Sequence, residues 1–156
     1  MFLVHLALAA DPCAGIDPCT VLERTPVGKD REVVHVAYMK KADVPTNVGE
    51  PLYGEPGACN RHAWWMVDGA KTRPILEVCN DGYGASGVGE DDVSVKDGVF
   101  THSQYGGSAW RWTNSRSIAL FPPAWVASSG YNHYMGLIGM GSEWDYKAGR
   151  GRFTET

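Results

Sequence analysis

The chain has 156 residues, 44% of them hydrophobic, which suffices for one domain with a sizeable core. Its formal net charge is -4 and its basic residues are scattered, so it lacks the phosphate-tracking surface of a nucleic-acid-binding protein. Its 19 glycines and nine prolines leave no room for long amphipathic helices. We therefore predict an all-β or β-rich fold, a single-domain antiparallel sandwich or partly open barrel with long loops.

Residues 1–10 are predicted to be a signal-peptide remnant. The apolar run from Phe2 to Ala10 ends in small residues and gives way abruptly to polar sequence at Asp11. A buried first strand is the alternative for so short an apolar run. No stretch approaches the roughly 20 apolar residues that a membrane-spanning helix requires. We expect a periplasmic or secreted protein, with residues 11–156 as one β-rich domain.

The four cysteines predict a disulfide framework, because exported proteins meet oxidising conditions. A hairpin with the three-residue turn Asp68-Gly69-Ala70 would set Cys59 opposite Cys79. Cys13 then pairs with Cys19 by elimination. A four-cysteine zinc site is the alternative, but the chain has no C-x-x-C spacing.

The first half of the chain contains one clear strand and one hairpin. Residues 11–30 carry few apolar positions and are predicted to be an irregular segment pinned by its disulfide. Residues 32–39 are β-branched and aromatic, as in a central strand, whereas residues 43–58 hold three prolines and three glycines and predict a long loop. The hairpin follows at residues 59–79, with Arg61 opposite Glu77, Ala63 opposite Ile75 and Trp65 opposite Arg73.

Residues 80–92 are predicted to be a glycine-rich acidic loop. Four carboxylates in this loop could bind a calcium ion: Asp81, Glu90, Asp91 and Asp92. Their spacing matches no EF-hand, however, and a solvated acidic loop is the simpler interpretation. The same loop contains G-x-G-x-x-G at residues 82–87, but no helix follows to bind a pyrophosphate. We predict no cofactor and no metal.

The second half of the chain predicts a meander. Residues 93–95 and 99–104 form a hairpin around Lys96-Asp97-Gly98. Further strands are predicted at residues 109–113, 118–121, 125–127, 131–135 and 144–146. The turns between them are predicted at residues 105–108, 122–123, 128–130 and 139–142.

The stretch at residues 92–101 and the following run Gly106-Gly107-Ser108-Ala109-Trp110-Arg111-Trp112 together resemble a hairpin of uncharacterised exported bacterial proteins. Their usual pattern is Gly-Gly-Ser-x-Trp-Arg-Trp. Residues 145–151 are similar to a pattern near the end of such proteins, a tyrosine followed by a small residue, a glycine and a basic residue. Together with the loop at residues 80–84, the resemblance covers about half of the chain. It departs from the pattern at residues 122–123, where a Pro-Pro pair replaces an aromatic strand. The resemblance implies export and a β fold, and it implies no activity.

The aromatic residues point to a binding surface. Six tryptophans and seven tyrosines cannot all fill one small core, so at least one tryptophan should lie near the surface. Strand alternation puts Trp64 and Trp65 on opposite faces, and Trp110 and Trp112 on one face with Arg111 opposite. Complete burial of these rings is the alternative. His102 joins this set because it is a polar residue on a strand face that also carries an aromatic side chain. The candidate binding residues are therefore Trp64, Trp65, His102, Trp110, Arg111 and Trp112.

These features favour a non-catalytic protein that binds another protein, such as an inhibitor or immunity protein. A carbohydrate-binding module is the second hypothesis, and it requires coplanar exposed rings in a shallow groove. A small hydrolase is the third. The chain has neither a Gly-x-Ser-x-Gly elbow nor a His-Glu-x-x-His motif, and its cysteines are assigned to disulfides, so we predict no catalytic residue.

Overall fold

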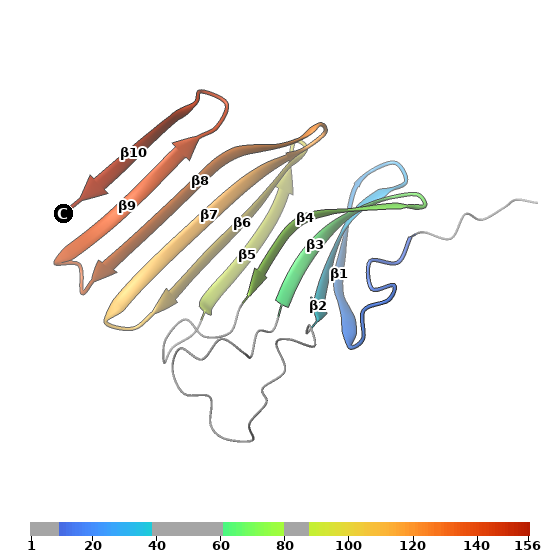
Figure 1. Cartoon of the computed structure of the whole chain (residues 1–156), viewed down its shortest axis with the longest axis horizontal. Helices are drawn as coiled ribbons and strands as arrows, with labels where there is room; N and C mark the ends of the chain where they lie inside the picture. Colours follow the sequence, from blue (N-terminus) through green and yellow to red (C-terminus); the bar gives the residue numbers. More distant parts are fainter. Residues whose placement is uncertain (1–9, 39–60, 80–87) are drawn as a thin grey trace, which may run out of the picture. The chain divides into compact units, whose positions relative to one another are not determined.

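The computed structural model describes residues 10–38, 61–79 and 88–156 (Figure 1). The chain divides into two compact units, Met1–Asn80 and Asp81–Thr156. Each unit contains one open antiparallel sheet, of four strands in the first and six in the second, so the predicted all-β class is confirmed. Within the described residues, no helix is long and apolar enough to cross a membrane. The assignment of residues 11–156 to a single domain stays a prediction.

The first sheet has the order β1-β2-β3-β4. Its strands are β1 (Cys19–Gly28), β2 (Arg31–Tyr38), β3 (Arg61–Asp68) and β4 (Lys71–Cys79). The predicted central strand at residues 32–39 is confirmed as β2. The prediction that residues 11–30 are irregular is wrong for β1, whose weak apolar pattern reflects an edge strand with most side chains exposed. Its backbone is held by the ladder to β2.

The predicted register of the β3–β4 hairpin is wrong. Asp68 pairs with Lys71 across a two-residue turn, and a bulge follows between Trp64 and Trp65, so Arg61 lies opposite Cys79. Arg61 still forms an ion pair with Glu77, at 2.7 Å, as a diagonal neighbour. Cys59 lies outside the described residues, so its disulfide with Cys79 stays a prediction.

One hydrophobic core cluster of the first unit lies on one face of its sheet, while Val33, Trp64 and Met66 are buried on the opposite face. The cluster consists of five buried side chains, Val34, Val36, Tyr38, Ala63 and Val67. The segment before β1 covers this face with Ala10, Ile16 and the Cys13–Cys19 disulfide. The predicted Cys13–Cys19 pair is therefore confirmed, and it closes a short loop directly over the core.

Replacing Cys13 and Cys19 together with serine should lower the free energy of unfolding by about 2 kcal/mol, because the crosslink restricts a short loop in the unfolded chain. Chemical denaturation followed by circular dichroism measures this change. Peptide mapping under non-reducing conditions should return the Cys13–Cys19 pair. The same map tests the Cys59–Cys79 prediction, since a mixed pair would contradict both assignments.

The second sheet has the order β10-β9-β8-β7-β6-β5, which is the chain order read backwards (Figure 1). Its strands are β5 (Val88–Lys96), β6 (Val99–Gly107), β7 (Trp110–Leu120), β8 (Pro123–Tyr134), β9 (Ile138–Asp145) and β10 (Arg150–Glu155). The predicted hairpin around Asp97 and Gly98 is confirmed as β5–β6. Both turn residues have positive φ angles, 51° and 75°, as a tight hairpin turn requires.

Several boundaries in the second sheet differ from the prediction. The acidic stretch 90–92 lies within β5 and is not a loop. The strands predicted at 109–113 and 118–121 are one strand, β7, and the polar stretch 128–130 continues β8 where a turn was predicted. The predicted turn at 105–108 is shifted, because β6 runs to Gly107. A two-residue turn at 121–122 is followed directly by β8, which begins at Pro123. The strand β10 was not predicted.

Candidate functional site

The register of the second sheet separates its side chains into two faces, because directly opposed residues of an antiparallel sheet share a face. One row runs from His102 on β6 through Arg116, Ser128 and Trp144 to Gly151 on β10. Moving two residues along each strand stays on this face. Exposed aromatic and aliphatic side chains gather there over β7 to β10, and we call this surface the aromatic face.

The aromatic face is open to solvent over β7 to β10. Its aromatic and aliphatic members on these strands include Trp110, Trp112, Trp125, Tyr134, Ile138, Met140, Trp144, Tyr146 and Phe153. Polar residues such as Asn114, Arg116, Ser128 and Ser142 lie on the same face between them. Trp110 is 53% exposed, Met140 63% and Phe153 76%. On β6 the same face is closed, since Phe100 and His102 are fully buried. One face thus changes from buried to solvent-exposed across the width of a single sheet.

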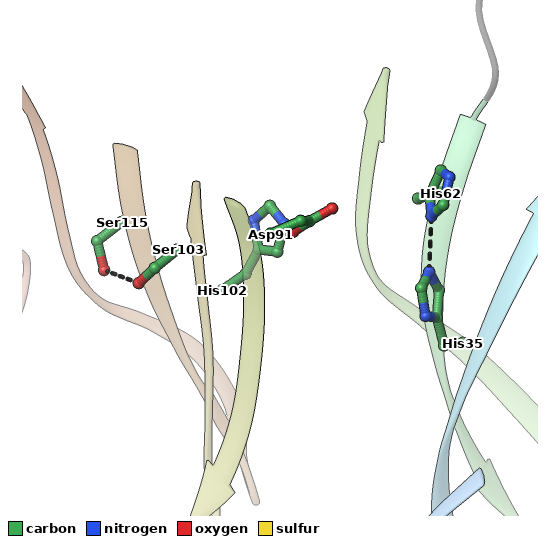
Figure 2. A network of polar contacts seen from close by, with 6 residues as sticks. All are labelled: His35, His62, Asp91, His102, Ser103 and Ser115. Carbon is green, nitrogen blue, oxygen red and sulfur yellow. Dashed lines mark hydrogen bonds and ion pairs between the residues drawn. The ribbon is translucent and has the colours of Figure 1, made fainter. Parts of the chain in front are cut away.

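The opposite face of the second sheet is polar. Pairs of hydroxyl groups bridge β6 and β7. The Ser103 and Ser115 hydroxyl oxygens lie 3.1 Å apart (Figure 2), and so do those of Thr101 and Ser117. Farther along, Arg152 donates to Glu143 at 2.7 Å. A groove with a volume of about 620 Å³ lies beside the Arg152–Glu143 pair. Its lining consists mainly of serines and of the charged residues Glu143, Asp145, Arg150 and Arg152. We call this surface the polar face.

Two aromatic rings lie against glycines of neighbouring strands. A Cβ atom at Gly151 would come within 2.4 Å of the Trp144 ring, and one at Gly139 within 2.3 Å of the Tyr131 hydroxyl. Each glycine therefore leaves room for a ring to lie close to the backbone. Trp144 also meets Phe153 edge-on, with ring centroids 5.7 Å apart. This packing fixes the orientation of Trp144 while 40% of its surface stays exposed.

The second sheet also contains a histidine–carboxylate pair. His102 Nε2 lies 2.7 Å from Asp91 Oδ1 (Figure 2), and His102 is fully buried. A buried imidazole cannot contact a substrate directly, so the pair is best understood as a polar link between β5 and β6. In the first sheet, His35 Nε2 lies 2.9 Å from His62 Nδ1, and the His35 ring stacks on Trp64 at 4.4 Å.

The structure places the predicted binding residues in different surroundings. Trp64 is buried and Trp65 is half-buried, on opposite faces of β3 as expected. Trp110 and Trp112 share the aromatic face, and Trp112 is half-buried. Arg111 is exposed on the polar face and donates to the Ser108 carbonyl at 3.3 Å. Of the predicted set, only Trp110 is both exposed and on the aromatic face.

The prediction missed most of the aromatic face. Trp125, Trp144 and Phe153 are all exposed there, and none was a candidate. Alternation along β9 and β10 would have identified Trp144 and Phe153, had the hairpin around Gly149 been recognised. Gly149 has a φ of 63° in that turn. Recognising β10 was therefore the missing step.

The acidic residues of β5 do not converge on one point, as the ligands of a calcium ion must. Glu90, Asp91 and Asp92 are consecutive strand residues, so their side chains alternate between the two faces. Asp91 contacts His102. Among the residues that the structure describes, no group of three His, Cys, Asp or Glu side chains could hold a metal ion. Asp81 lies outside the described residues.

No protein-family model, curated protein or solved structure matches the chain. The resemblance of residues 106–112 to a hairpin of exported bacterial proteins stays a prediction. Inference about function therefore depends on the geometry of the two faces.

Proposed function

We propose that this is a non-catalytic binding protein that holds another protein against the aromatic face of its second sheet. One observation carries the proposal: large apolar side chains lie exposed on one face of β7 to β10. They form two groups, Trp110 with Ile138 at one end of the strands and Trp125, Trp144, Tyr146 and Phe153 toward the other. Trp110, Trp125 and Trp144 are 53%, 47% and 40% exposed. Soluble proteins rarely leave a contiguous apolar surface uncovered unless it binds something. Tryptophan, tyrosine and methionine are also the residues that protein interfaces favour.

The orientation of the rings supports a protein partner over a glycan. A sugar chain stacks on coplanar rings, but the Trp144 and Phe153 planes meet at 89° and the Trp110 and Tyr134 planes at 47°. The exposed aliphatic side chains Ile138 and Met140 lie among them. They offer no hydrogen bond to a sugar hydroxyl, whereas an apolar protein surface packs well against them.

An exported inhibitor or immunity protein is the specific form of this proposal. The apolar segment at residues 1–10 motivates export, and the Cys13–Cys19 disulfide is in keeping with an oxidising compartment. A rigid sheet suits such a role, because a preorganised surface loses little conformational entropy on binding.

The proposal predicts that Trp110→Ala weakens partner binding by about 30-fold or more while the protein stays folded, as hot-spot truncations do. The immobilised full chain is used to capture candidate partners from exported proteins of the source organism. Each captured protein is then purified and its affinity measured by calorimetry against the wild type and the variant. Circular dichroism verifies that the variant is folded.

The matched control is Tyr131→Ala, which removes a partly exposed ring from the polar face. It should leave partner affinity within about threefold of the wild type, since contacts outside the interface are nearly neutral. The proposal is wrong if every captured protein binds Trp110→Ala as tightly as the wild type, or if Tyr131→Ala weakens binding equally. A glycan-array signal that Trp110→Ala removes would favour the carbohydrate alternative.

A further inference from the structure

The outer strand of the second sheet offers a row of backbone groups for pairing. In the sheet that the structure describes, β10 has β9 on one side only. All six residues of β10 are exposed. Edge strands of this kind are templates for adding a further strand, and proteins shorten, charge or cover them to prevent it.

The hydrogen bonds at the end of β10 show which residues point outward. Thr156 and Gly139 exchange two backbone bonds, of 3.0 and 3.1 Å. In an antiparallel ladder such doubly bonded pairs alternate with pairs that exchange none. Arg152 and Arg150 therefore direct their N–H and C=O groups toward β9. The intervening residues Gly151, Phe153 and Glu155 direct theirs to the open edge.

We propose that β10 pairs antiparallel with β10 of a second copy of this chain, with Phe153 on the two-fold axis. Phe153 of one copy then exchanges both backbone bonds with Phe153 of the other. Gly151 does the same with Glu155 of the other copy. This register uses every outward-pointing residue of β10, and it opposes residues that belong to the same face of the sheet.

The charges of β10 disfavour the registers on one side of the proposed one. Sliding the copies by two residues in one direction sets Arg152 opposite Arg152 of the other copy, and a further step sets Arg150 opposite Arg152. Like charges in directly opposed positions destabilise a sheet. Sliding in the other direction sets Phe153 opposite Glu155 of the other copy, so the two Phe153 rings would no longer pair. In the proposed register Arg152 faces Thr154, and its ion pair with Glu143 of its own chain is kept.

Pairing in this register would also extend the aromatic face. Phe153 lies on that face next to Trp144, and the two Phe153 rings would meet at the axis. Opposed aromatic pairs are among the favourable cross-strand contacts. The two copies would thereby present one continuous aromatic surface. The pairing itself needs no partner protein, so it can be tested independently of the proposed function.

Sedimentation of the full chain from about 1 to about 300 μM should show a monomer–dimer equilibrium, as expected for a small interface. Phe153→Pro removes an outward N–H that β9 does not use, and should weaken the dimer by at least about 30-fold. Phe153→Ala is the matched control, because it removes the same ring but keeps the N–H, and it should weaken the dimer by less than about tenfold. Circular dichroism establishes that both variants are folded.

Crosslinking tests the register even if Phe153→Pro fails to fold. Arg152→Cys chains mixed with Thr154→Cys chains should form disulfide-linked heterodimers, because these positions face each other in a closely spaced pair. Arg152→Cys alone should not crosslink. A monomer at all concentrations, equal effects of Phe153→Pro and Phe153→Ala, or crosslinking by Arg152→Cys alone would overturn the proposal.

Discussion

Replacing Gly107 with valine is expected to lower the free energy of unfolding by about 3 to 4 kcal/mol. Gly107 has a φ of 96°, which a β-branched residue adopts only under strain. A Cβ atom there would also lie 2.0 Å from the Trp110 carbonyl oxygen, so the backbone of the β6–β7 turn must move. Chemical denaturation of the purified protein, followed by circular dichroism, measures the loss.

Gly98→Val is the control for this prediction. Gly98 also has a positive φ, 75°, but a Cβ atom would meet no atom within 4 Å. Its valine variant carries the strain without the collision and should lose about 1 to 2 kcal/mol. The assignment of a close approach at Gly107 is wrong if the two variants are equally stable.

Trp64→Ala is expected to lower the free energy of unfolding by about 3 to 5 kcal/mol. Trp64 is 2% exposed, and its ring stacks on His35 from the neighbouring strand β2. Alanine would leave a large cavity that the surrounding strands cannot fill, and dispersion contacts with His35 would be lost. Denaturant titration measures the change.

Trp110→Ala is the contrasting variant, because it makes the same chemical change at a ring that is 53% exposed. We expect it to reduce stability by about 1 kcal/mol or less, since little buried surface is lost. Equal losses from the two variants would mean that Trp110 is buried in solution, and the aromatic face would then not be available to a partner.

Much of the fold was predictable where local signals agreed with each other. The β-branched run of β2 and the Asp97-Gly98 turn each have one physical interpretation, and both are confirmed. The prediction failed at residues 128–130, where two serines and a glycine suggested a turn. Within β8 their backbone groups pair with those of β7 and β9. Gly130 also leaves room for the Asn114 side chain, because a Cβ atom at position 130 would lie only 3.1 Å from Asn114 Oδ1. Tertiary context outweighed local propensity there.

The aromatic face was only partly predictable. The expectation that at least one tryptophan lies near the surface is confirmed, and Trp110 and Trp112 share a face as alternation requires. Alternation assigns residues to faces, but it does not tell which face is covered. Trp64 and Trp110 have similar strand surroundings in the sequence, yet one is buried and the other exposed. That difference depends on contacts between segments distant in sequence.

The strictly sequential strand order of the second sheet bears on how it assembles. Every strand from β5 to β10 pairs only with its neighbours in the chain, so no strand waits for a distant segment before it can join the ladder. Folds built from such local contacts close short loops and fold quickly for β proteins. The sheet can therefore grow hairpin by hairpin along the chain. Local opening should start at β10, which has one neighbour and no buried residue, so its amides should exchange with solvent sooner than those of β6 and β7.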